Sequence, residues 1–92
     1  MRRAARRDDG EDEIVDALRA KGVYVKKVNA EGFADLVCWY KGRTLILEVK
    51  DGKKPPSARK LSDAEQRFHD DWPGDNLHIV LSADDAIAKF DW

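Results

Sequence analysis

The sequence predicts a single α/β domain with a mixed four-stranded sheet flanked by helices. Three observations support this fold class. Apolar residues recur at helical spacing near both ends of the chain, while short runs rich in strand-forming residues occupy its middle. The segments follow one another in the order helix, three strands, helix, strand and a last short helix. With 92 residues, the chain has the length of one domain. We expect a basic, flexible tail at 1–10 and the domain at 11–92.

The first predicted helix covers residues 11–21 and stops at Gly22, a residue common after helix ends. Its inward stripe is Ile14, Val15 and Leu18, and a strand over 23–28 follows. The next two strands, in the runs 32–40 and 44–50, are joined by a turn at Lys41–Gly42.

Residues 51–60 contain Gly, Pro and Ser and are expected to form a loop. The second helix begins with the capping-box spacing of Ser62 and Glu65, and Pro73–Gly74 ends it. A strand over 77–81 and a short helix capped by Ser82 complete the domain.

The predicted hairpin brings two acids together. With a loop of two or four residues centred on Lys41–Gly42, residue 40 pairs with 43 and Asp35 pairs with Glu48. Carboxylates about 5 Å apart repel by roughly 3 kcal/mol at an effective dielectric constant of 20. A positive group between them would remove this cost, and a divalent cation is the natural candidate.

Alternation along the strands places Lys50 on the same face as the two acids. Val37, Trp39 and Ile46 share that face and make it apolar, so we expect it to be covered. The alternative is an edge hairpin that carries a solvated Glu48–Lys50 pair.

Together these motifs resemble the PD-(D/E)xK nucleases, and more narrowly their VRR-NUC branch in its stand-alone phage and bacterial form. The resemblance covers 11–86. It includes the acidic first helix, the segments Gly32-Phe33-Ala34-Asp35-Leu36 and Leu47-Glu48-Val49-Lys50-Asp51-Gly52, and the start of the second helix. Ala34 departs from the proline that usually precedes the motif aspartate. The resemblance implies a restriction endonuclease-like α-β-β-β-α-β core and metal-dependent hydrolysis of DNA.

In such a nuclease, Asp35, Glu48 and the carbonyl of Val49 would hold Mg²⁺ or Mn²⁺. Lys50 would orient or deprotonate the attacking water or stabilise the developing charge; its alternative role is an ion pair with Glu48. The resemblance makes Glu11 a further ligand, with Glu13 as a weaker substitute. Glu11 shares the face of the inward stripe. It could equally be an acid that favours the first helical turn.

Other polar residues near the predicted site have simpler explanations. Glu65 occupies a position next to the active site in the family, but it also closes the capping box, while Gln66 is typical of a solvated helix. His69 and His78 have no Cys or His partner at metal-ligand spacing, so we assign neither to catalysis.

Nucleic-acid binding is expected from the basic loop, with Lys53, Lys54, Arg59 and Lys60, and from the four arginines of 1–7. The net charge of −1 alone would not predict it. The resemblance implies a homodimer that cuts branched DNA such as four-way junctions. A catalytically inactive DNA-binding or accessory module, an RNA substrate, and a small structural protein are the alternatives. A solvated loop is the alternative for the basic segment.

The remaining features set the expected environment of the protein. The single cysteine, Cys38, excludes an internal disulfide and is expected to be a small buried apolar residue. No apolar run approaches a membrane span, and the arginine-rich start is not followed by an apolar stretch. We therefore expect a protein of the cytoplasm, in a bacterial or phage-infected cell, with neither a membrane nor an organic cofactor as partner.

Overall fold

The computed structural model describes residues 10–28 and 30–92. The arginines of the predicted tail lie outside the described residues. The helices are α1 (Glu11–Lys21), α2 (Asp63–Asp71) and α3 (Ala83–Ala88), and the strands are β1 (Tyr24–Lys27), β2 (Leu36–Tyr40), β3 (Arg43–Val49) and β4 (Leu77–Val80). This order confirms the predicted one. The predicted loop at 51–60 differs in one respect, because Pro56–Arg59 form a short 3-10 helix, η1.

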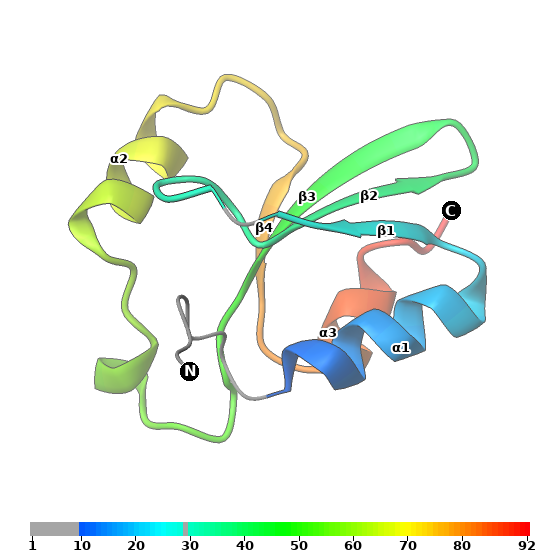
Figure 1. Cartoon of the computed structure of the whole chain (residues 1–92), viewed down its shortest axis with the longest axis horizontal. Coiled ribbons are helices and arrows are strands. Elements are labelled where there is room, and N and C mark those ends of the chain that lie inside the picture. The colour runs from blue at the N-terminus through cyan, green and yellow to red at the C-terminus, as the bar shows by residue number, and fades with distance from the viewer. Residues whose placement is uncertain (1–9, 29) are drawn as a thin grey trace, which may run out of the picture.

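The four strands form one mixed sheet in the order β1-β2-β3-β4. The first three are antiparallel neighbours, whereas β4 runs parallel to β3. A parallel pair needs a crossover connection, and the segment with η1 and α2 provides it. Figure 1 shows α1 and α3 together on one side of the sheet and α2 on the other side. The α/β class with a mixed four-stranded sheet is thereby confirmed.

The β2–β3 hairpin has the predicted register. Tyr40 pairs with Arg43 and Leu36 pairs with Leu47, so the next position along the ladder sets residue 35 opposite residue 48. The two turn residues both have positive φ, 50° at Lys41 and 80° at Gly42. This is the conformation of a type I′ turn, whose twist matches that of the flanking strands. The turn thus fixes which residues meet at the far end of the hairpin.

The hydrophobic core lies between the sheet and the pair α1 and α3. The predicted stripe of α1 is buried there, and Phe90 from the segment after α3 is buried with it. Cys38 is also fully buried, as predicted, and burial raises the pKa of its thiol to about 12. The buried apolar side chains of this core are Ile14, Val15, Leu18, Val23, Val25, Leu36, Cys38, Leu45, Leu47, Val49, Val80, Ala86 and Phe90.

The opposite face of the sheet is covered in part. Phe68 of α2 stacks against Phe33 and Trp72, with ring centroids 4.8 and 5.4 Å away. Ile46 is buried on this face, as expected. Trp39, nearer the hairpin turn, is 42% exposed, so the expectation of a fully covered face is wrong there. The reason is the length of α2, which has nine residues and ends before it reaches the turn end of the hairpin.

One edge of the sheet is β1, whose outer side faces solvent. Arg19 of α1 reaches this edge, where its Nη2 donates a hydrogen bond to the backbone oxygen of Val25 at 3.1 Å. In the described part of the chain, none of the helices has the length and apolar character that a membrane span requires.

Candidate active site

Asp35 is held rigidly just before β2. Its backbone N–H donates to the oxygen of Leu47 at 3.0 Å, and its backbone oxygen accepts from the N–H of Val28 at 2.8 Å. The carboxylate oxygen Oδ2 accepts a third hydrogen bond, from the backbone N–H of Val49 at 2.8 Å. The backbone groups of three residues, Val28, Leu47 and Val49, thus fix the position of one predicted ligand.

Glu48 projects from β3 beneath α2 and is only 1% exposed. Its carboxyl group lies beside that of Asp35 and interacts with it, as the register of the hairpin predicts. Within the described residues, its buried oxygen Oε1 accepts no hydrogen bond. A buried carboxyl oxygen without a hydrogen bond is costly, and the cost is largest when the group is charged.

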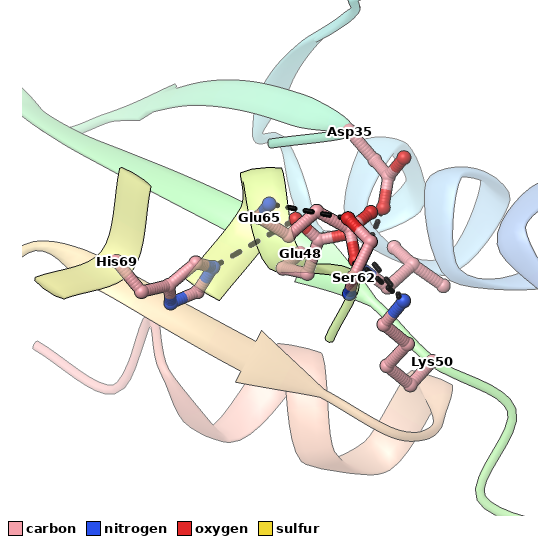
Figure 2. A network of polar contacts seen from close by, with 7 residues as sticks. Asp35, Glu48, Lys50, Ser62, Glu65 and His69 are labelled. Atoms are coloured by element: carbon pink, nitrogen blue, oxygen red, sulfur yellow. Dashed lines mark hydrogen bonds and ion pairs between the residues drawn. The ribbon is translucent and has the colours of Figure 1, made fainter. Parts of the chain in front are cut away.

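Lys50 brings a positive charge close to Glu48 and Glu65. Its Nζ lies 3.1 Å from Oε1 of Glu65 and 4.0 Å from Oε2 of Glu48. Figure 2 shows the Lys50 amine on one side of Glu48 and the ring of His69 on the other. The predicted cluster of Asp35, Glu48 and Lys50 therefore forms, and a fourth residue, Glu65, joins it.

Glu65 closes the predicted capping box and also contacts Lys50 of this cluster. Its Oε1 accepts the backbone N–H of Ser62 at 2.9 Å, while its own backbone N–H donates to Oγ of Ser62 at 3.1 Å, which completes the capping box. The same Oε1 accepts from Lys50. Gln66 points elsewhere, since its side chain is exposed and donates to Asp70.

His69 was not predicted to belong to the site, yet it faces Glu48. Its Nε2 lies 3.7 Å from Oε1 of Glu48, and its side chain is 14% exposed. Glu65 and His69 are four residues apart, so they share one face of α2. That spacing could have indicated His69, whereas a search for metal-ligand pairs could not. His78 pairs with Leu47 on β3 and so lies on the core side of the sheet, as a residue without a role in the site.

Burial and neighbouring charges control the protonation of the cluster. Burial, the neighbouring Asp35 and the charge of Glu65 together raise the pKa of Glu48 to about 9, although Lys50 acts to lower it. Burial also raises the pKa of Glu65, but the hydrogen bond from Ser62 and the contact with Lys50 outweigh this effect and lower it. Burial lowers the pKa of His69. Without a metal ion, a proton therefore relieves the repulsion between Asp35 and Glu48.

The other predicted site residues have different surroundings. Glu11 is 2% exposed in the first turn of α1, which agrees with its predicted inward orientation, and its part in the site stays a prediction. Val49 contributes its backbone N–H to Asp35; its carbonyl as a ligand also stays a prediction. Lys53, Lys54 and Lys60 are exposed on the connection between β3 and α2, and Arg59 ends η1 with partial burial.

The carboxyl groups of the cluster are few for a metal site. Among residues 10–28 and 30–92, no group of three or more His, Cys, Asp or Glu side chains could hold a metal ion as it stands. Mg²⁺ needs fewer protein ligands, because it keeps several of its waters and binds through one or two carboxylates. Asp35 and Glu48 supply two carboxyl groups in contact, and Glu48 has a buried oxygen without a hydrogen bond. The residues fit Mg²⁺ or Mn²⁺ in this form.

Comparisons with family models, with curated proteins and with solved structures found no match for this chain.

Proposed function

We propose that this chain is a metal-dependent nuclease that hydrolyses phosphodiester bonds of DNA at the Asp35–Glu48 pair. The main support is Glu48, a fully buried carboxyl group in contact with a second one, with an oxygen that accepts no hydrogen bond within the described part of the chain. A structural role alone would not favour this arrangement, because an apolar residue at position 48 would avoid the cost of burying the acid.

The chain's own residues have separate tasks in this proposal. Asp35 and Glu48 hold Mg²⁺ or Mn²⁺, and Asp35 is oriented for this by the backbone N–H of Val49. When bound, the ion lowers the pKa of a water molecule and neutralises charge on the phosphoryl group. Lys50, held within 3.1 Å of Glu65, orients the attacking water or stabilises the pentavalent charge. His69 packs against Glu48 and restricts the access of bulk water to it.

The proposed family follows from the same residues. The order α1, β1, β2, β3, α2, β4 and the positions of Asp35, Glu48 and Lys50 on the hairpin agree with a restriction endonuclease-like core of the VRR-NUC branch. In this proposal, the partner is DNA, with branched or four-way junctions favoured, and the working form is a homodimer. The exposed Lys53, Lys54 and Lys60 would contact phosphates without reading sequence.

The function can be tested by a cleavage panel. Purified protein would be incubated with linear, nicked, flapped and four-way DNA and with single-stranded RNA, in Mg²⁺, in Mn²⁺ and in EDTA. We expect divalent-dependent cleavage that Glu48→Gln and Asp35→Asn lower by at least about 100-fold, since such groups stabilise charge in the transition state. Asp84→Asn is the matched control, because it makes the same change from carboxylate to amide on exposed α3, across the sheet from the site.

Two results would contradict the proposal. Cleavage that Glu48→Gln leaves unchanged would place the activity elsewhere or in a contaminant. Tight binding of DNA without cleavage in either metal would favour the inactive DNA-binding module instead.

A further inference from the structure

Among residues 10–28 and 30–92, the large apolar side chains that remain exposed lie on the face of the sheet that carries the acidic pair. They are Tyr24, Trp39 and Ile79, with exposures of 61, 42 and 41%. Trp39 lies four residues after Asp35, so the two side chains share a face, and Tyr24 is the cross-strand partner of Trp39. Ile79 pairs with Glu48 on the other side.

Tyr24 and Trp39 form a tilted aromatic pair in the part of this face beyond α2. Their ring centroids are 5.5 Å apart and the rings are inclined by 51°. Lys26, the next residue of β1 on the same face, is exposed beside them. The pair is about 13 Å from Asp35, given the usual rise of four residues along a strand. That distance equals about four base steps along one strand of B-form DNA.

We propose that the Tyr24–Trp39 pair is a stacking platform for unpaired bases of the nucleic-acid strand whose backbone enters the acidic site. This inference depends on the proposed function and narrows its substrate class to DNA with a single-stranded segment next to the cleaved bond. Exposed aromatic rings beside a cation are the elements by which proteins bind unpaired bases and their phosphates. A duplex keeps its bases stacked inside and offers no free base face to the two rings.

A contact between two copies of the chain is less consistent with the surface. Ile79 is on β4 at one edge of the sheet, whereas Tyr24 is on β1 at the opposite edge. The exposed apolar side chains therefore do not form one continuous patch, and a specific protein interface buries about 800 Å² on each partner. Lys26 next to the rings favours a polyanion over an apolar partner.

Fluorescence titration with oligothymidylate in EDTA tests the platform, because EDTA prevents cleavage. The chain has three tryptophans, and Trp39→Phe identifies the signal of residue 39 by difference. We expect the oligonucleotide to quench Trp39 emission. Trp39→Leu and Tyr24→Leu, which remain apolar but cannot stack, should weaken binding by about 5- to 150-fold for each base lost from the stack. Trp39→Phe should bind within a few-fold of the natural chain. Thermal melts check that each variant is folded.

The outcomes separate this inference from the nuclease proposal. One outcome is that the natural chain cleaves DNA in a metal-dependent manner, while Trp39→Leu and the natural chain bind oligothymidylate equally tightly. In that case the platform is wrong and the nuclease function stands. If no cleavage occurs but both Leu variants lose binding, the platform stands and the nuclease proposal fails. Sedimentation gives a third outcome: self-association that Trp39→Lys abolishes, in a chain that does not bind the oligonucleotide, would assign the rings to a contact between copies and overturn the inference.

Discussion

At the scale of single residues, the surroundings of Glu48 give its carboxyl group a pKa far from that of an ordinary glutamate. Burial and the neighbouring carboxyl groups of Asp35 and Glu65 oppose its charged form, and they raise its pKa to about 9. A proton and a divalent cation are therefore alternative ways to neutralise the same pair of acids. Lys50 contributes too little to replace them, because its amine lies closer to Glu65 than to Glu48.

The raised pKa of Glu48 predicts how the metal-free protein responds to pH. Because the folded state keeps a proton that the unfolded state releases above about pH 4.5, stability falls as the pH rises toward 9. The slope is at most about 1.4 kcal/mol per pH unit. Glu48→Gln should remove this dependence of stability on pH. In EDTA, the melting temperature of the variant should therefore exceed that of the natural chain by a margin that grows between pH 6.5 and 8.5.

This pH window isolates Glu48 from the other shifted groups. His69 and His78 have lowered pKa values, so their stabilising effects are lost only as the pH falls below about 6.5. The pKa of Cys38 is raised to about 12, and its influence begins above pH 9. Parallel melting curves of the two proteins across the window would contradict the assignment of a proton to Glu48.

At the scale of elements, α2 links helix capping to the candidate site. Oε1 of Glu65 accepts hydrogen bonds from the backbone N–H of Ser62 and from the amine of Lys50. The cap of α2 and the position of Lys50 therefore depend on the same oxygen. The next turn of α2 presents His69 to Glu48. A change at Ser62 should therefore affect the site through Glu65, although Ser62 itself is exposed and its hydroxyl and backbone N–H both bond to Glu65 (Figure 2).

A pair of capping variants tests this link. Ser62→Ala and Ser82→Ala each remove a side chain that accepts a backbone N–H at the start of a helix, and each should cost about 1 kcal/mol of folding free energy. Only Ser62→Ala should also lower metal-dependent cleavage, by several-fold at a temperature where both variants are folded, because Glu65 and Lys50 lose their fixed positions. Equal activities at equal stability would show that α2 capping and the site are independent.

At the scale of the whole molecule, the sheet separates the apolar core from the acidic cluster. The side covered by α1 and α3 contains the apolar core, while the acidic cluster lies on the side of α2 (Figure 1). Substitutions in the cluster should therefore change metal binding without loss of the core. Asp35 and Glu48 lie at the open end of the hairpin, and the crossover that carries Glu65 and His69 leaves β3 at this same end.

Ligand linkage gives a measurement of metal binding that is independent of cleavage. Mg²⁺ or Mn²⁺ at 100 times its dissociation constant should stabilise the folded chain by about 2.7 kcal/mol. For a domain of this size, that shifts the melting temperature by roughly 10–20 °C. The shift should disappear in Asp35→Asn and Glu48→Gln and persist in Asp84→Asn. An equal shift in all four proteins would indicate nonspecific ion binding.

The sequence was sufficient to predict the register of the hairpin. It was not sufficient to predict which residues of α2 would face Glu48. The register of β2 and β3 followed from a two-residue turn and strict alternation, which are local properties. His69 and Glu48 are far apart in sequence, and they meet only because α2 crosses the sheet at a particular angle and height. The exposure of Trp39 likewise depends on where α2 ends, and η1 depends on how Pro56 orients its short segment. Such features are set by tertiary packing, which residue patterns do not specify.

The hydrogen bond from Arg19 to the oxygen of Val25 has a consequence for aggregation. An open sheet can recruit strands from other molecules at an unprotected border, which is a common first step toward fibres. Here a bulky charged group occupies an acceptor on that border, so an incoming strand would lose one rung of its ladder and meet a positive charge. Growth by strand addition along β1 is thereby discouraged.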